Sequence, residues 1–120
     1  MVYKGDFTLE DGYNLMKNMV SLKNIPSAVF VASDPMAIGA YKAITEKGLK
    51  IPEDISIIGF DDIMTAKFLT PALTTVKVYT DFMGETALNT LIDRIVNNRE
   101  LSKKTVLPVK LIIRESCKKI

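Results

Sequence analysis

Two pairs of polar residues, Ser33-Asp34 and Asp61-Asp62, each follow directly after an apolar stretch of the sequence. A hydroxyl and ionised carboxylates in such positions can hydrogen-bond to the hydroxyl or amine groups of a small polar ligand. Phe7, which follows Asp6, can form a stacking wall for a flat ligand or a sugar face. Together these residue types point to recognition of a small molecule.

Each of these residues also has a purely structural interpretation. Asp34 is placed to cap the helix that follows it, and one residue of the Asp61-Asp62 pair can cap the next short helix. Phe7 stands just before a helix, where an apolar residue often packs as a hydrophobic staple. From spacing alone we interpret Asp34 as a cap and Phe7 as a staple, and we favour Asp61 as a ligand contact.

The composition excludes several classes of chemistry. With no histidine and a single cysteine, Cys117, the 120 residues cannot build a Ser-His-Asp or Cys-His nucleophile, a His or multi-Cys zinc site, or an internal disulfide. We therefore expect no enzyme, no metal and no cofactor.

Charge and hydropathy point to the compartment and to the class of partner. The net charge is +2, and adjacent basic residues occur only as the isolated pairs Lys103-Lys104 and Lys118-Lys119, so these residues should not bind nucleic acid. No apolar run has the length of a membrane span, and the first residues are not a secretory signal. We therefore expect a cytoplasmic protein.

Helix and strand patterns alternate along the chain. Thr8, with Asp11 three residues later, indicates a capped helix, and Gly48 suits the left-handed position after a second helix. The apolar strands lack polar alternation, which predicts strands buried on both faces. We expect helices over 8–20, 35–47, 63–69 and 81–98 and strands over 28–32, 55–60 and 73–78. The last strand has signals at 105–107 and 109–114, with an edge or a bend at Pro108 between them.

This order predicts one α/β domain with a mostly parallel sheet flanked by helices. Ligands of open parallel sheets bind beyond the carboxyl ends of the strands. If strands 28–32 and 55–60 are neighbours, Ser33 and Asp61 lie on one rim.

Four sequence blocks, taken together and in this order, carry a resemblance. They are residues 33–40 (SDPMAIGA), 47–62 (KGLKIPEDISIIGFDD), 70–76 with 83–87, and 107–116. This set resembles LacI/GalR-type bacterial transcriptional repressors and covers essentially the whole chain. Residues 68–100 are most similar to the purine-repressor branch of that family.

The resemblance implies that residues 1–120 are the C-terminal part of an effector-binding core related to type I periplasmic binding proteins. It implies that helix 81–98 belongs to the other, N-terminal subdomain of that core. The parent would bind a sugar or purine effector and form a homodimer. It would contact operator DNA only through an N-terminal domain missing here.

The resemblance also carries individual residues. It implies that Asp61 contacts the effector and that Phe7 lies against the base in purine-binding relatives. Ser33 stands where the family often has an asparagine that contacts sugar hydroxyls.

A dimer interface is predicted on helix 35–47 and on the segment after strand 55–60. Helical periodicity places Ile38 and Tyr41 away from the stripe that packs on the sheet, and the resemblance implies contacts at Ile38 and around Phe68. The predicted interface is Ala37, Ile38, Tyr41, Phe68 and Leu69.

Two alternatives remain open. A periplasmic sugar-binding protein has the same fold, and a phosphoacceptor α/β domain can also carry paired acids at a strand end. The second alternative is the weaker one, because the chain offers no evident lysine-centred acid pocket.

Helix 81–98 carries an apolar stripe that is too wide to leave in water. The helix can fold back onto its own sheet, pair with the same helix of a second copy, or lie in an exchanged position on a neighbour, and we favour pairing between copies. The residues of the stripe are Ala87, Leu88, Leu91, Ile92, Ile95 and Val96.

Overall fold

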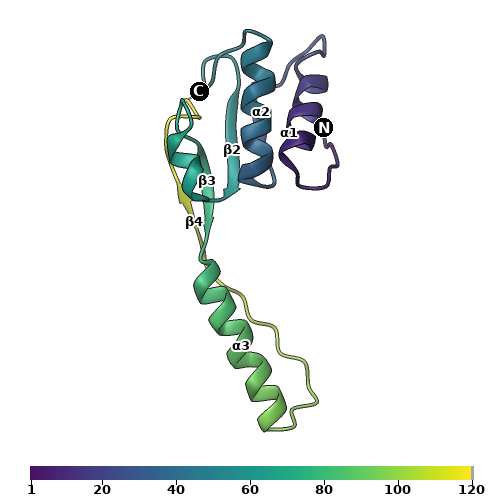
Figure 1. The fold of residues 1–120 in the computed structure, drawn as a ribbon, viewed down its shortest axis with the longest axis vertical. Coiled ribbons are helices and arrows are strands. Elements are labelled where there is room, and N and C mark those ends of the chain that lie inside the picture. Colours follow the sequence, from purple (N-terminus) through teal and green to yellow (C-terminus); the bar gives the residue numbers. More distant parts are fainter. Residues whose placement is uncertain (120) are drawn as a thin grey trace. The chain divides into compact units, whose positions relative to one another are not determined.

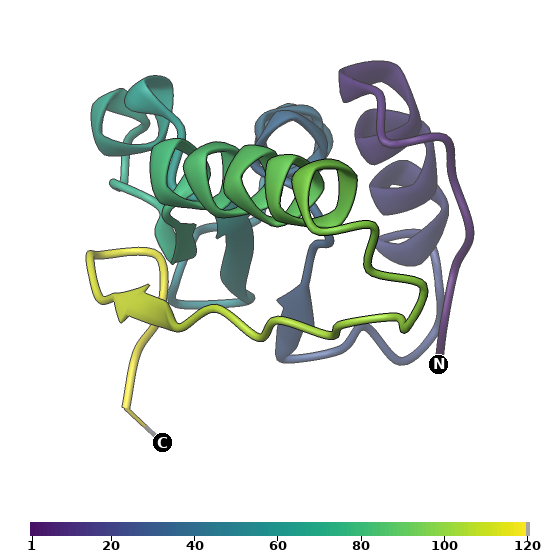
Figure 2. The same cartoon turned by 90° about the horizontal axis from the view of Figure 1, so that it is seen from below.

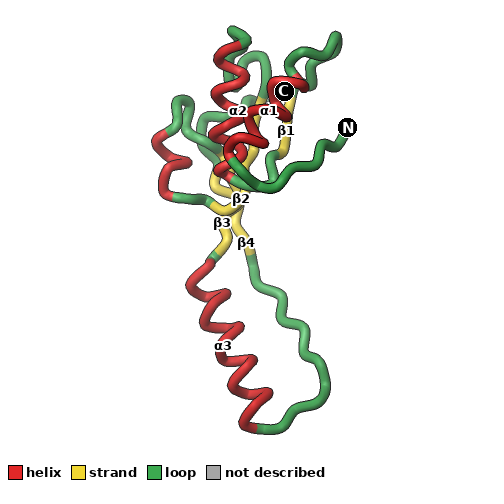
Figure 3. Tube along the Cα trace, turned by 45° about the vertical axis from the view of Figure 1, so that its right-hand side comes forward, coloured by secondary structure: helices red, strands yellow, loops and turns green. Residues whose placement is uncertain are grey.

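The computed structural model describes residues 1–119 and alternates helices with strands (Figure 1; Figure 3). Its elements, in chain order, are α1 (Leu9–Met19), β1 (Ala28–Phe30), α2 (Asp34–Glu46), β2 (Ser56–Asp61), the 3₁₀ helix η1 (Met64–Phe68), β3 (Thr74–Val78), α3 (Thr80–Val96) and β4 (Val109–Ile112).

The strands form a four-stranded sheet in the order β1-β2-β3-β4. β1 pairs with β2 in parallel, with Phe30 opposite Ile58, and β2 pairs with β3 in parallel, with Asp61 opposite Lys77. The predicted α/β fold with a mostly parallel sheet is confirmed. The strand expected at 105–107 does not form, and only Val109–Ile112 joins the sheet there.

Contacts divide the chain into two compact units. The first comprises residues 1–77 and the segment from Leu111 onward, and the second comprises Val78–Lys110 with α3. The polar residues singled out from the sequence all lie in the first unit.

Local side-chain bonds start α1 where the sequence predicts. Thr8 Oγ1 accepts a hydrogen bond from the Asp11 amide at 3.0 Å, and Asp11 Oδ2 accepts from the Asp6 amide at 2.8 Å. The bonds from the Asp6 amide and from Thr8 lower the pKa of Asp11, because they stabilise its charged form. The predicted cap is confirmed.

Two glycines let α1 and α2 pack at very short range, and the helices lie side by side (Figure 1; Figure 2). A Cβ on Gly12 would lie 2.0 Å from the Met36 carbonyl oxygen, and one on Gly39 would lie 2.0 Å from the Leu9 carbonyl oxygen. The first turns of the two helices are therefore in backbone contact.

The core lies between these helices and one face of the sheet. Ile44, Ile55, Ile57 and Leu73 are fully buried within it. The expectation of strands buried on both faces is wrong, because Phe30 in β1 is 60% exposed and β2 alternates buried with half-buried residues. The physical reason is that α1 and α2 pack against one face only, and that β1 lies at the edge of the sheet.

No residue of α3 is buried. The stripe expected from the sequence is exposed: its large side chains range from 48% exposed at Ile92 to 71% at Val96, and Ala87 is exposed as well. Among the described residues, no helix combines the length and the apolar character needed to cross a bilayer.

Candidate functional site

β1 and β2 are neighbouring parallel strands, so their carboxyl ends lie at the same edge of the sheet, which is the condition for a shared rim. The parallel register continues past β1 through a 2.8 Å hydrogen bond from the Val31 amide to the Ile58 carbonyl. Ser33 follows one strand and Asp61 ends the other, so the structure brings them to the same edge of the sheet.

Asp61 leaves its strand in an unusual conformation and keeps a free carboxylate. Its φ is 113°, a value that residues other than glycine rarely adopt. Within the described part of the chain, no hydrogen bond or ion pair reaches this carboxylate. Burial, and then the nearby charge of Asp34, raise the pKa of Asp61. Asp61 therefore offers an acceptor to a ligand.

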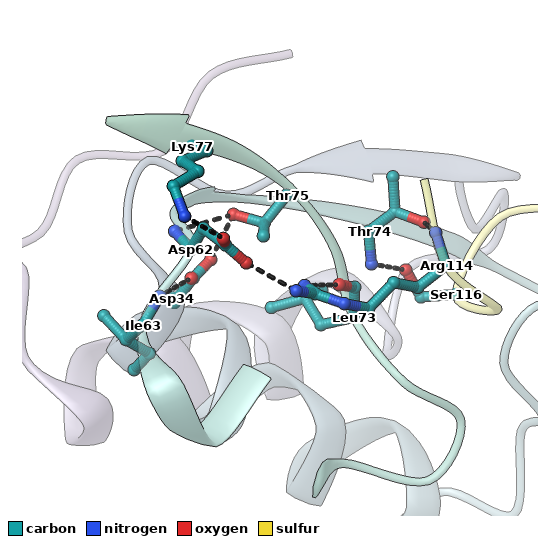
Figure 4. Close-up of polar contacts among 9 residues, drawn as sticks. All are labelled: Asp34, Asp62, Ile63, Leu73, Thr74, Thr75, Lys77, Arg114 and Ser116. Atoms are coloured by element: carbon teal, nitrogen blue, oxygen red, sulfur yellow. Dashed lines mark hydrogen bonds and ion pairs between the residues drawn. The ribbon is translucent and has the colours of Figure 1, made fainter. Parts of the chain in front are cut away.

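Asp62 has a different environment although it is the next residue. Arg114 Nη2 donates to its Oδ1 at 2.6 Å, and Lys77 Nζ lies 3.6 Å from its Oδ2 (Figure 4). Its backbone amide donates to Thr75 Oγ1 at 3.4 Å. The alternative interpretation, in which one of these two acids caps η1, is wrong, because the N-cap is Ile63 and no side chain caps that helix.

Asp34 is a buried tertiary contact rather than a helix cap. Its side chain is fully buried, Oδ1 accepts from Thr75 Oγ1 at 2.7 Å, and Oδ2 accepts from the Ile63 amide at 2.9 Å. The capping prediction for Asp34 is wrong. Ser33 caps α2 instead, since its Oγ accepts from the Met36 amide at 3.4 Å.

Ser33 is consequently less available than its sequence position indicates. It is 6% exposed, and its oxygen is used by the cap. A hydroxyl can accept and donate at the same time, so its proton can still serve a ligand. Contact between Ser33 and a ligand stays a prediction.

Phe7 is exposed and does not act as a staple. It is 62% exposed, and its φ is 62°. Phe7 directly precedes Thr8, the N-cap of α1. The first turn of α1 is in contact with the first turns of α2. The staple interpretation is wrong, and the ring is free to contact a ligand.

The predicted dimer face is only partly at the surface. Ala37 is fully buried and Tyr41 is 7% exposed, so the prediction that Tyr41 faces outward is wrong. The Tyr41 hydroxyl donates to the Pro71 carbonyl at 3.0 Å, and burial raises its pKa to about 12. Ile38 and Leu69 are half-buried and Phe68 is 72% exposed, so these three remain available for an interface, which stays a prediction.

Two polar residues that the sequence pattern did not single out, Thr75 and Arg114, support the rim. Thr75 and Arg114 bind Asp34 and Asp62, and Thr74 and Ser116 tie β3 to the C-terminal segment (Figure 4). A usable signal was present, because two threonines inside a buried strand need hydrogen-bond partners. Among the described residues, no group of His, Cys, Asp and Glu side chains could hold a metal ion.

Residues 1–117 match the family described as the periplasmic binding protein-like domain. The chain belongs to this family. Its curated relatives include the HTH-type transcriptional repressor MelR of Bacillus subtilis, 47% identical over 94% of this chain and 33% of that protein. PurR of Salmonella arizonae, also an HTH-type transcriptional repressor, is 46% identical over 96% of this chain and 34% of that protein. The chain thus spans about a third of the length of these relatives.

Solved structures give the same relationship. The lac repressor dimer bound to operator and the anti-inducer ONPF superposes with a TM-score of 0.86 at 34% identity, covering 94% of this chain and 39% of that one. A LacI family transcriptional regulator from Enterococcus faecium with bound ribose gives 0.82 at 32% identity, covering 93% and 41%. The chain is therefore part of a LacI-type effector-binding domain, and its relatives are regulators rather than enzymes.

Proposed function

We propose that this chain forms one wall of the effector site of a LacI-type transcriptional regulator, as the C-terminal part of its effector-binding and dimerisation domain. Phe7, Ser33 and Asp61 line that wall. The observation that carries the proposal is the Asp61 carboxylate, which ends β2 without a protein partner among the described residues. The relatives named as transcriptional repressors support the regulatory role.

The mechanism is a shift of population without covalent chemistry. An effector that binds one relative orientation of the two subdomains better than the other stabilises that orientation. The same difference in affinity then changes the affinity of the regulator for operator DNA. Asp61 contributes by accepting hydrogen bonds from the effector.

Residues 78–110 belong, in this proposal, to a different part of the domain. We assign α3 to the N-terminal subdomain, as a helix that follows a crossover of the chain. Two observations support this assignment: the contacts separate residues 78–110 as their own unit, and none of the α3 residues is buried.

The effector is a small molecule that carries hydrogen-bond donors, either a sugar or a purine. The ribose held by the Enterococcus relative favours a sugar, and the exposed Phe7 ring provides a flat apolar surface that suits either class. An ionised carboxylate accepts equally well from sugar hydroxyls and from a purine N–H.

The regulator acts as a cytoplasmic homodimer, with contacts through Ile38, Phe68 and Leu69. The lac repressor relative is a dimer bound to its operator. We assign operator binding to residues of the regulator outside this chain, because these 120 residues carry a net charge of only +2.

Calorimetry on the full-length regulator tests the Asp61 assignment, with D-ribose and hypoxanthine as probes. Asp61→Asn should weaken binding of the active probe by roughly 10- to 150-fold, because hydrogen bonds to charged groups contribute about 1.5–3 kcal/mol. Operator affinity without effector should not change. Glu53→Gln, at an exposed acid, is the matched control. Unchanged binding by Asp61→Asn would remove Asp61 from the site.

The 120-residue chain alone should bind either probe at least 100-fold more weakly than the full-length regulator. A cleft between two subdomains gains affinity from both walls and from exclusion of water, and this chain supplies one wall. Micromolar binding of D-ribose or hypoxanthine by the chain alone, measured by calorimetry, would contradict the half-site model.

A further inference from the structure

Two consecutive residues at the end of β2 adopt left-handed backbone conformations. The φ values are 113° for Asp61 and 57° for Asp62, and neither residue is glycine. In this region the side chain crowds its own backbone, so the conformation persists only where the surrounding structure holds it. The turn at Asp61-Asp62 therefore needs an anchor.

Asp34 and Thr75 provide that anchor from two other elements. Thr75 Oγ1, on β3, accepts from the Asp62 amide at 3.4 Å and donates to Asp34 Oδ1 at 2.7 Å. Asp34 Oδ2, in the first turn of α2, accepts from the Ile63 amide at 2.9 Å. Two successive backbone amides of the turn are thus fixed by one buried pair of side chains (Figure 4).

Gly59, in β2, leaves the space that the Asp34 carboxylate occupies. A Cβ at this position would lie 2.2 Å from Asp34 Oδ1. Asp34 and Thr75 are both fully buried, so neither side chain is accessible to a ligand. Their contacts are directed at the protein backbone beside Asp61.

We infer that Asp34 and Thr75 are positioning residues of the effector site, which hold the turn at residues 61–63 so that the Asp61 carboxylate stays at the rim, free of protein partners. The inference rests on the proposed function of Asp61. It assigns to Asp34 and Thr75 an effect on effector affinity without any contact with the effector.

Thr75→Val tests this inference, and Thr74→Val is its matched control. Both threonines are buried, but the Thr74 hydroxyl accepts from the Arg114 amide at 2.9 Å and not from the turn. In the 120-residue chain, Thr75→Val should accelerate hydrogen exchange of the Asp62 amide at least tenfold by NMR. Thr74→Val should leave that amide unchanged, and Thr75→Ser should restore slow exchange.

Effector affinity in the full-length regulator is the second measurement, with D-ribose and hypoxanthine titrated by calorimetry. Thr75→Val should weaken binding of the active probe at least tenfold, whereas Thr75→Ser and Thr74→Val should bind like the wild type. Asp34→Asn, which keeps the size of the side chain, should accelerate exchange at the Ile63 amide and weaken binding in the same way.

The outcomes separate the inference from the proposed function. If Asp61→Asn weakens binding as expected but Thr75→Val binds as tightly as Thr74→Val, the positioning role is wrong and the site stands. If Asp61→Asn binds normally, the proposed function fails. Unchanged exchange at Asp62 and Ile63 in folded Thr75→Val and Asp34→Asn overturns the positioning role, whether or not either probe binds.

Discussion

At the scale of single residues, the neighbouring acids Asp61 and Asp62 differ in their bonding. The Asp62 carboxylate is bonded to Arg114 at 2.6 Å, whereas the Asp61 carboxylate has no partner among the described residues. Burial and a nearby like charge disfavour the charged form of an acid, and both act on Asp61. The charged Asp61 carboxylate therefore lowers the stability of the fold, and it remains available to a ligand.

Asp61→Asn should therefore raise the free energy of unfolding at neutral pH while it weakens effector binding. The folded-state pKa of Asp61 is raised, so protonation stabilises the fold below the ordinary value of 3.8, and this stability is lost as the pH rises through the folded-state pKa. Asparagine removes the charge at every pH, and, like aspartate, it is a residue that can adopt left-handed backbone.

Urea unfolding at pH 7 and at pH 3 checks the prediction. The advantage of Asp61→Asn over the wild type should shrink at pH 3, where the wild-type carboxyl takes up its proton. An Asp61→Asn variant that is less stable than the wild type at pH 7 would contradict this account, and Glu53→Gln serves as the charge-matched comparison.

At the scale of elements, the contact between α1 and α2 depends on two residues without side chains. Each glycine lies against the backbone of the opposite helix, and neither has a positive φ. Alanine ordinarily stabilises a helix relative to glycine. Here the close approach decides the result, because a methyl group has no space.

Gly39→Ala should destabilise the chain by about 1–3 kcal/mol, the range typical of an overpacked core. Gly84→Ala, in α3, should instead stabilise its helix by about 0.5–1 kcal/mol, because nothing lies within 4 Å of the added methyl group. Thermal unfolding followed by circular dichroism measures both. Equal effects of the two substitutions would show that helix propensity, not packing, governs Gly39.

At the scale of the whole molecule, two exposed apolar surfaces call for partners. One is at Phe68 in the first unit, with the half-buried Ile38 as a second predicted contact, and the other is the stripe along α3 in the second unit. Leaving each large side chain of such a stripe in water forgoes roughly 1.5–3 kcal/mol. Each surface should therefore be covered in solution.

Ile38→Asp and Phe68→Glu should each convert the full-length regulator from dimers to monomers in light scattering. A charge in a desolvated apolar interface lacks a partner, which costs several kcal/mol. Asn18→Asp, at an exposed position on α1, should leave the dimer intact. If both interface variants remain dimeric, the interface lies elsewhere.

The 120-residue chain should associate through α3 independently of that surface. Association should survive Ile38→Asp, whereas combining Leu91→Glu with Ile95→Glu should yield smaller species and weaker binding of a hydrophobic dye. Glutamate keeps helix propensity high, so α3 should remain folded. A wild-type chain that is a compact, dye-free monomer would contradict the prediction.

The sequence by itself determined the features that depend on neighbouring residues. The order of helices and strands, the Thr8 cap and the left-handed Gly48 with a φ of 79° all follow from local patterns and are confirmed. The position of Asp61 at the end of an apolar strand was predictable for the same reason. The parallel pairing of β1 with β2 then placed Ser33 at the same rim.

Only the tertiary structure decided which polar group bonds with which. Asp34 reads as a local cap in the sequence, yet its hydrogen-bond partner Thr75 lies 41 residues away. Tyr41 reads as a surface residue, yet its hydroxyl reaches Pro71, 30 residues away. Apolar strands read as buried on both faces, yet α1 and α2 cover only one. A buried polar group needs a hydrogen-bond partner, and in this fold the partner often comes from a residue far away in the sequence. Local periodicity does not indicate which distant residue that partner is.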